Sequence, residues 1–214
     1  MEKARKKTRE KQIIDILAQL YPNPRSALNF RTPYELLVAT ILSAQCTDKR
    51  VNEITAKLFP RANTPEQMIE LGIEGIEEYI RGLGLFRNKS KNIYRTSQIL
   101  LEKFNGEVPR TREELMQLPG VGRKTANVVL ANAFQIPALA VDTHVHRVSN
   151  RLGLVAAKKV EETEAQLMDL IPKAEWIDVH HQLIYHGRNL CTARRPRCDE
   201  CPLLPYCPTG AVLQ

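Results

Sequence analysis

Two predicted helices meet at a glycine turn in the segment Leu118-Pro119-Gly120-Val121-Gly122-Arg123-Lys124-Thr125-Ala126. Thr111 and Glu114 have the spacing of a capping box, which predicts a first helix over residues 112–118. The proline removes a backbone donor, and the two glycines permit a tight turn with positive φ. A second helix is predicted over residues 123–134. Its first backbone N–H groups and the positive end of its dipole suit an anion such as a DNA phosphate. A helical hairpin packed inside an all-α core is the competing interpretation of so short a motif.

Lys124 is a candidate nucleophile because it lies in the first turn of the second helix, where a cation is unfavourably placed. The helix N-terminus, the neighbouring Arg123 and partial desolvation would all favour the neutral amine, which is the form that attacks an electrophile. Most lysines are solvated surface residues, and that reading competes here. The position beside a predicted phosphate site favours the catalytic role.

Asp142 is the candidate partner of Lys124, eighteen residues further along the chain. It precedes a predicted helix and is expected to cap it. The connection over residues 135–141 can span about 24 Å, which exceeds the roughly 18 Å length of the preceding helix. The chain can therefore return Asp142 to the end where Lys124 lies, although capping alone would also explain the aspartate.

Four of the five cysteines follow the pattern Cys191-x6-Cys198-x2-Cys201-x5-Cys207. Disulfides need an oxidising compartment, and the charged N-terminal segment does not have the pattern of a signal peptide. Structural zinc sites usually combine two closely spaced pairs, whereas the spacing here contains one. Ligation by cysteine alone also suits an iron–sulfur cluster, towards which the spacing leans. Cys46 is expected to be a buried apolar residue of a helix and no ligand.

The composition is that of a basic globular protein of 214 residues, with 43% hydrophobic residues and a net charge of +7. No apolar run is long enough to span a membrane. The positive charge indicates a polyanionic partner or a solvated basic surface. Two basic clusters stand out: Arg188, Arg194, Arg195 and Arg197 near the cysteines, and Lys3, Arg5, Lys6, Lys7, Arg9 and Lys11 at the N-terminus, where a frayed, solvated helix start is equally expected.

Helical periodicity continues through the rest of the chain and predicts an all-α fold. An N-terminal helix carries apolar residues over 13–21, and a capping box at Thr32 opens a buried helix over 36–44. Thr64 begins another helix, and a further one is predicted over 88–104. His180, His181 and His186 are not aligned on one helical face, so packing or hydrogen bonding is expected for them instead of metal binding.

The chain resembles the endonuclease III family, helix-hairpin-helix DNA glycosylases that carry an iron–sulfur cluster. The similarity runs from about Ile13 to Cys207. The matching segments are residues 118–126, 141–144, 42–45, 84–85, 180–181 and 186–188, together with the four cysteines.

The resemblance implies two helical lobes, one of six helices over residues 26–136 with the hairpin, and one formed by residues 1–25 and 137–214. The second lobe would carry a [4Fe–4S] cluster on the loop 191–207, held by the four cysteines. Lys124 would be the nucleophile and Asp142 its catalytic partner. The DNA-binding residues would be Gly120, Val121, Gly122 and Arg123 in the hairpin, Arg194, Arg195 and Arg197 beside the cluster, and Gln45 and Leu85, which would fill the gap of an extruded nucleotide.

The implied activity is that of a bifunctional DNA glycosylase and apurinic/apyrimidinic (AP) lyase, which excises oxidised pyrimidines through a lysine Schiff base and β-elimination in base excision repair. The implied partner is duplex DNA with damaged bases or abasic sites, and no association with a membrane is expected. A monomer is expected, in the cytoplasm of a bacterial-type cell and associated with the nucleoid.

Three alternatives compete with this interpretation. An adenine-mismatch glycosylase shares the fold and the cluster, but it normally lacks the hairpin lysine and carries an added C-terminal domain. A helix-hairpin-helix module could grip DNA without catalysis, and a zinc-bearing regulator could use the same cysteines.

Overall fold

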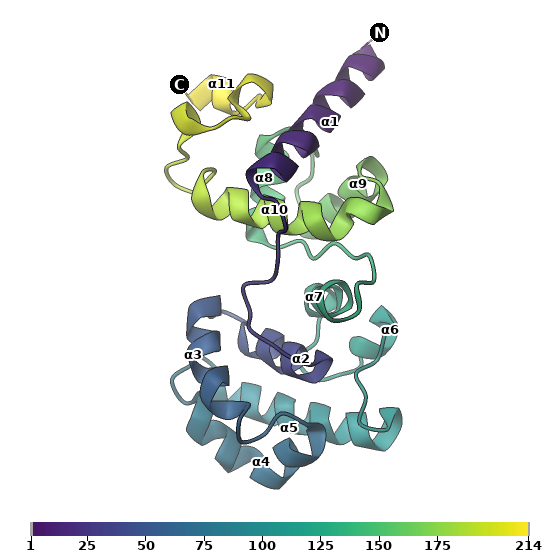
Figure 1. Cartoon of the computed structure of the whole chain (residues 1–214), viewed down its shortest axis with the longest axis vertical. Helices are drawn as coiled ribbons and strands as arrows, with labels where there is room; N and C mark the ends of the chain where they lie inside the picture. The colour runs from purple at the N-terminus through teal and green to yellow at the C-terminus, as the bar shows by residue number, and fades with distance from the viewer. Residues whose placement is uncertain (1, 214) are drawn as a thin grey trace. The chain divides into compact units, whose positions relative to one another are not determined.

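The computed structural model describes the backbone of residues 2–213 and the side chains of residues 8–212. The described backbone is helical and contains no strand, which confirms the all-α prediction (Figure 1). Its internal contacts define two compact units, one of Met1–Arg25 with Pro137–Gln214 and one of Ser26–Ile136. No helix among the described residues is long and apolar enough to cross a membrane.

The unit Ser26–Ile136 consists of six helices, in which α4 packs along α5 and α2 packs against both α5 and α7. The buried faces of α2 and α5 form its centre, and nearly every side chain of α2 is buried. The helices are α2 (Pro33–Leu42), α3 (Asp48–Leu58), α4 (Pro65–Ile80), α5 (Phe86–Phe104), α6 (Arg112–Leu115) and α7 (Arg123–Phe134).

The other unit is assembled from both ends of the chain, and its α10 packs against α8 and α1. Short 3₁₀ turns interrupt the segment that carries the last three cysteines. The elements are α1 (Glu2–Leu20), α8 (Thr143–Arg151), α9 (Val160–Leu170), η1 (Lys173–Glu175), α10 (Trp176–Asn189), η2 (Cys198–Glu200), η3 (Leu204–Tyr206) and α11 (Gly210–Leu213).

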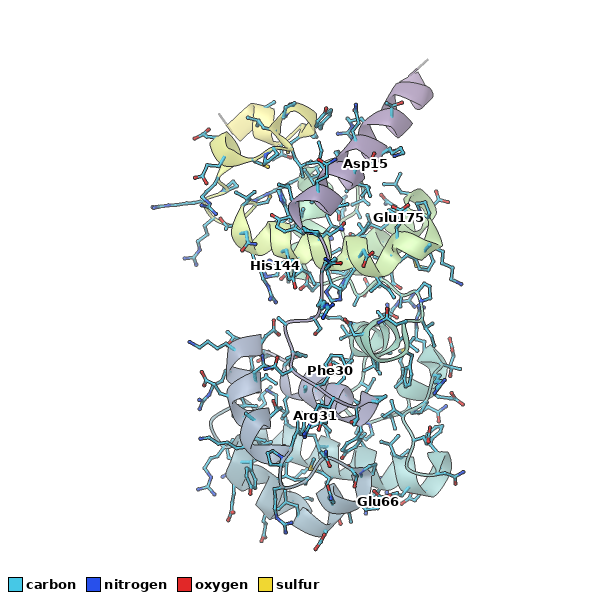
Figure 2. All side chains as sticks on the ribbon, viewed as in Figure 1. Asp15, Phe30, Arg31, Glu66, His144 and Glu175 are labelled. Atoms are coloured by element: carbon cyan, nitrogen blue, oxygen red, sulfur yellow. The ribbon has the colours of Figure 1, made fainter. Side chains whose placement is uncertain are left out.

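The helix starts that the sequence predicts are confirmed by threonine N-caps at Thr32, Thr64 and Thr111. Each hydroxyl accepts a hydrogen bond from the backbone N–H three residues later, as a cap should. The capping box at Thr32 differs from the usual form, in which the glutamate accepts a hydrogen bond from the backbone N–H of the N-cap residue. The Glu35 carboxylate accepts from the backbone N–H of Arg31, at 2.6 Å, and also pairs with the guanidinium of Arg31, which is labelled in Figure 2.

The predicted helix ends were wrong at two places. α6 ends at Leu115 instead of Leu118, and the N–H groups of Gln117 and Leu118 bond to carbonyls three residues back, because a residue before proline avoids the α conformation. α2 ends at Leu42 instead of Ala44, so Cys46 lies outside any helix and is half-buried. The helix expected over 88–104 begins two residues earlier, at Phe86.

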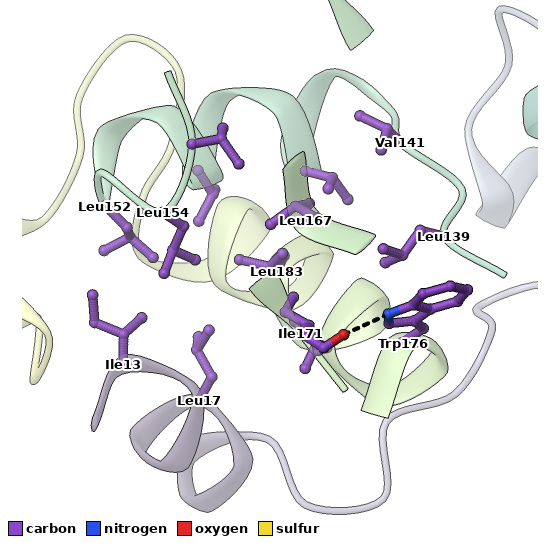
Figure 3. Close-up of a cluster of buried hydrophobic side chains, with 14 of the residues drawn as sticks. Ile13, Leu17, Leu139, Val141, Leu152, Leu154, Leu167, Ile171, Trp176 and Leu183 are labelled. Atoms are coloured by element: carbon purple, nitrogen blue, oxygen red, sulfur yellow. Dashed lines mark hydrogen bonds between the residues drawn. The ribbon is translucent and has the colours of Figure 1, made fainter. Parts of the chain in front are cut away.

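An apolar cluster holds α1 against the C-terminal half of its unit (Figure 3). Ile13 and Leu17 of α1 are fully buried in this cluster. Trp176 closes one side, and its indole N–H donates to the carbonyl of Ile171 at 2.8 Å. The remaining buried members are Leu139, Val141, Val145, Val148, Leu152, Leu154, Val155, Leu167, Val179, Leu183 and Leu203.

The basic N-terminal segment is partly structural. The Arg9 guanidinium donates to the carbonyls of Leu152, Gly153 and Tyr206, at 2.8–3.1 Å, so the solvated helix start, one of the two open interpretations, does not apply to this residue. Lys11 pairs with Asp15 across one turn. The side chains of Lys3, Arg5, Lys6 and Lys7 lie outside the described residues.

The cluster around Leu17 predicts that Leu17→Ala lowers the free energy of unfolding by about 2–5 kcal/mol, because it leaves a cavity in a packed core. Trp176, the only tryptophan of the chain, belongs to the same cluster, so its fluorescence during urea titration reports on this unit. Gln19→Ala, at an exposed position of the same helix, should change little. Equal midpoints for the two variants would contradict the role of Leu17.

Candidate active site and cluster-binding loop

The hairpin turn between α6 and α7 is held against α5. Gly120 has φ +79°, and a Cβ there would lie 2.8 Å from Nδ2 of Asn92, so both backbone and space require glycine. The Thr96 hydroxyl donates to the carbonyl of Pro119 at 3.2 Å. The turn is therefore positioned by two side chains of a neighbouring helix.

Gly122 has a role different from the one we expected. Its φ is −89°, outside the left-handed region, and it is the N-cap of α7. No side chain caps this helix. Apart from the neighbouring residues of the chain, no atom lies within 4 Å of the place that a Cβ of Gly122 would occupy. An approaching anion can therefore reach the start of α7, where backbone N–H groups and the helix dipole favour it.

Lys124 is the second residue of α7, as predicted, so it lies in the first turn of this open helix start. The partial desolvation that we expected is absent, because the side chain is exposed. The positive end of the α7 dipole and the adjacent Arg123 remain as the positive features next to Lys124.

Asp142 caps α8, which confirms the predicted N-cap. Its Oδ1 accepts hydrogen bonds from the backbone N–H groups of His144 and Val145, both at 2.8 Å. Its Oδ2 makes no hydrogen bond to any residue in the described part of the chain. The bonds to Oδ1 thus fix the orientation of the carboxylate, and Oδ2 remains able to accept a hydrogen bond or a proton. Lys124 and Asp142 belong to different units, so their pairing stays a prediction.

Gln45 and Leu85 share an uncommon backbone conformation. Gln45 has φ +56° and Leu85 has φ +59°, in the left-handed region that bulky residues rarely adopt. The Leu85 side chain is 55% exposed although leucines normally bury. Strain of this kind in exposed residues is characteristic of binding sites.

The four cysteines of the cluster-binding loop, residues 191–207, line one common cavity. Its other walls are largely apolar and include Leu152, Leu190 and Leu204. No group of three or more described acidic, histidine or cysteine side chains is placed to hold a single metal ion. Cys191, Cys198, Cys201 and Cys207 are all half-buried and form no disulfide.

The sulfur atoms lie in surroundings that fit an iron–sulfur cluster. Burial raises the pKa of the Cys198 and Cys201 thiols, and the charges of the neighbouring cysteines raise them further. Four thiolates are therefore stable together only around a cation, which iron would supply. The Gly210 N–H donates to Cys207 Sγ at 3.2 Å, the kind of bond that stabilises a thiolate ligand.

The histidines of α10 are buried, as expected for packing groups. The Nδ1 atom of His186 hydrogen-bonds with the Tyr21 hydroxyl at 3.2 Å, and its Nε2 lies 3.7 Å from Cys201 Sγ. Burial lowers the pKa of His186 to about 4. His180 and His181 contact each other edge to face.

Two arginines of α8, which sequence reasoning missed, hold the cluster-binding loop. Arg147 donates to the carbonyls of Gly187 and Cys191 at 2.9 and 3.1 Å. Arg151 donates to the carbonyls of Thr192 and Ala193 at 2.7 and 2.8 Å, and to the Cys191 sulfur at 3.5 Å. Their four-residue spacing on a predicted helix was the available signal, but their carbonyl partners lie about forty residues away and cannot be read from sequence.

The arginines of the cluster-binding loop differ in their engagement. Arg194 and Arg195 are exposed, and neither side chain hydrogen-bonds to another described residue. Arg197 is exposed too, but its guanidinium donates to the Asn189 carbonyl and pairs with Glu200 at 3.1 Å. The first two are therefore freer than the third to meet a phosphate.

Two family models match the chain. One, described as "HhH-GPD superfamily base excision DNA repair protein", matches residues 38–173. The other, described as "Iron-sulfur binding domain of endonuclease III", matches residues 191–207. This second match covers all four cysteines, and the cofactor of the chain is a [4Fe–4S] cluster.

Curated relatives agree with the family models. Endonuclease III of Escherichia coli (strain K12) is 51% identical over 94% of this chain and 95% of its own length. Endonuclease III of Bacillus subtilis (strain 168) is 49% identical over 92% of this chain and 90% of its own length.

Two solved structures cover nearly the whole chain. The "Structure of a non-covalent Endonuclease III-DNA Complex" matches with a TM-score of 0.92 and 49% identity, over 97% of each chain. A trapped covalent endonuclease III–DNA intermediate matches with a TM-score of 0.90 and 50% identity, over 95% of this chain and 98% of the other. The resemblance seen in the sequence is confirmed, and the chain belongs to the endonuclease III family of helix-hairpin-helix base excision DNA repair proteins.

Proposed function

We propose that this protein is a bifunctional DNA glycosylase and AP lyase that excises oxidised pyrimidines from duplex DNA, with Lys124 as its nucleophile. The observation that carries the proposal is the exposed side chain of Lys124 in the first turn of α7, whose N-terminus no side chain caps. A phosphate bound at that helix end would hold the DNA backbone next to the amine. Membership of the endonuclease III family supports the same activity.

The chemistry follows from an amine attacking a sugar. The neutral Lys124 amine attacks C1′ of the damaged nucleotide, the bond to the base breaks, and the base leaves with the electron pair and takes up a proton. Opening of the sugar ring gives a Schiff base between Nζ and C1′. The Schiff base acidifies the C2′ hydrogen, whose removal expels the 3′ phosphate by β-elimination. Water then hydrolyses the imine and frees Lys124.

Asp142 would act as the catalytic partner through the carboxylate oxygen that does not cap α8. A negative charge near C1′ stabilises the positive charge that develops on the sugar as the base leaves. The same oxygen could accept a proton from the attacking amine. Because Oδ1 is fixed by two backbone N–H groups, the carboxylate is held in one orientation before substrate binds.

The remaining predicted residues would bind DNA. Gly120, Val121, Gly122 and Arg123 form the start of α7 and its turn, where a phosphate would sit. Leu85 and Gln45 would fill the gap left by the extruded nucleotide, since an apolar wedge offsets the loss of base stacking. Arg194 and Arg195 would contact further phosphates, and Arg197 would do so only in part, because it is engaged with Asn189 and Glu200.

The [4Fe–4S] cluster, held by Cys191, Cys198, Cys201 and Cys207, would cross-link the loop that presents these arginines. The partner would be duplex DNA with damaged bases or abasic sites, bound by a monomer. Association with the nucleoid would follow from that substrate.

Lys124→Gln should abolish both base release and strand cleavage while leaving binding to damaged duplex intact, because it removes the amine and keeps much of the side-chain length. The measurement is borohydride trapping on duplex DNA with one oxidised pyrimidine. Lys103→Gln, at an exposed position of α5, serves as the matched control and should be trapped like the unmodified protein. A robust adduct from Lys124→Gln would sink the assignment.

Asp142→Asn should lower the single-turnover rate by about 10²-fold or more, because it removes the charge that stabilises the transition state. The amide oxygen can still accept both helix N–H bonds, so the melting temperature should change little. Thermal denaturation and single-turnover kinetics on the same preparation separate the two roles. Full activity, or unfolding, would reduce Asp142 to a helix cap.

Replacing Arg194 and Arg195 together with alanine should weaken binding to damaged and undamaged duplex alike. The slope of log affinity against log salt should flatten by about 0.9 for each phosphate that the variant no longer neutralises. The double variant Lys158→Ala/Lys173→Ala removes two exposed charges elsewhere in the unit and serves as the control. An unchanged slope in the arginine variant would show that these side chains are only solvated.

A further inference from the structure

A buried lysine joins the two loops that carry Gln45 and Leu85. Lys89 lies near the start of α5 and is 3% exposed. Its Nζ donates to the Cys46 sulfur at 3.1 Å, and this is its one hydrogen bond to a side chain within the described residues. Lysine side chains are rarely buried to this extent unless they have a partner, and here the partner is Cys46.

The contact connects the two loops through a short path. The Leu85 carbonyl accepts the backbone N–H of Lys89 at 3.0 Å. On the other side, Cys46 directly follows Gln45, and its N–H bonds to the Ser43 carbonyl at 3.0 Å. Lys89 is thus bonded to the Leu85 loop by its backbone and to the Gln45 loop by its side chain. Both loops hold their exposed residue in the left-handed conformation.

A second contact joins the same two loops. Arg50 lies in the first turn of α3, the helix that follows the Gln45 loop, and its guanidinium lies over Gly82 in the loop before Leu85. A Cβ at Gly82 would overlap Nη2 of Arg50, so the guanidinium would have to move aside if Gly82 carried a side chain. Leu83 is buried beneath the same loop. Arg50 of α3 therefore lies against the Leu85 loop, while the Leu85 side chain remains exposed.

We propose that Lys89 is a positioning residue, which clamps the Gln45 and Leu85 loops together so that both side chains enter the duplex as one preformed wedge. The inference rests on the proposed function, which assigns these two residues to the gap of an extruded nucleotide. A wedge formed in advance avoids ordering two loops at the moment when the base stack opens. Lys89 itself touches neither the sugar nor the phosphate.

The test compares two substrates that differ in their need for the wedge. In a duplex with one oxidised pyrimidine, extrusion of the nucleotide leaves a gap in the base stack that the wedge must fill. A single-stranded oligonucleotide with an abasic site has no such gap. Lys89→Met keeps the bulk of the side chain and removes the charge. We expect it to lower the single-turnover rate on the duplex by about tenfold, and to leave strand cleavage on the single strand within about twofold.

Lys91→Met is the matched control, since Lys91 is exposed on the same helix. It should cleave both substrates like the unmodified protein. Equal losses of rate on the two substrates in Lys89→Met would overturn the proposal, because general damage to the fold affects both. A changed salt slope for duplex binding would also overturn it, because Lys89 would then contact a phosphate. Unmodified protein that cleaves neither substrate would overturn the proposed function and this inference with it.

Cys46→Ala tests the contact from its other side and does not depend on the folding of Lys89→Met. It removes the acceptor at a half-buried position and should lower the duplex rate while sparing the single strand. The double variant should be no slower than the slower single variant, because both changes remove one interaction. Rate reductions that multiply, or a Cys46→Ala rate equal to that of the unmodified protein, would show that the contact does not carry the positioning.

Discussion

The hydrogen bonds from Arg147 and Arg151 to the cluster-binding loop are the interaction on which the unit of residues 1–25 and 137–214 depends. Both arginines lie on α8, whose first turn is capped by Asp142. Gly187 lets α10 approach α8 closely, since a Cβ there would lie 3.0 Å from Val148. The same short helix therefore orients the Asp142 carboxylate at one end and holds Cys191 at the other. Removal of the cluster would loosen the loop and take hydrogen-bond partners away from α8.

Two of the candidate site residues, Gly122 and Asp142, lie at helix starts. Asp142 and Gly122 are both N-caps, but they use opposite strategies. The aspartate satisfies the N–H groups of its helix with its own carboxylate, whereas the glycine leaves them accessible. One helix end is thus occupied by a fixed negative charge, and the other is ready to receive one. At the N-cap position, aspartate thus makes the start of α8 a candidate acid–base group, whereas glycine makes the start of α7 a candidate phosphate site.

Local chemistry explains which features could be predicted from the sequence. Threonine caps, the glycine turn and the extent of α7 depend on neighbours within four residues, so they were readable. The early end of α6 follows from Pro119 and could have been anticipated from its restriction of the preceding residue. The hydrogen bond from Arg147 to the Cys191 carbonyl and the one from Lys89 to Cys46 could not be predicted from the sequence. In each, the two residues are more than forty positions apart and are brought together only by the fold. The role of Gly122 was misread because glycine at a helix start serves as well with negative φ as with positive φ.

The assembly of one unit from both chain ends has a consequence for synthesis on the ribosome. Arg9 bonds to Tyr206 and Tyr21 to His186, across 197 and 165 residues. The apolar face of α1 therefore has no partner until nearly the whole chain has emerged, whereas residues 26–136 are contiguous and can fold in the meantime. Closing so long a loop is entropically slow, and Ile13 and Leu17, which are buried in the folded unit, lack their native partners until it closes. The apolar face of the nascent first helix is thus without its native partners for most of the time that the chain is being synthesised.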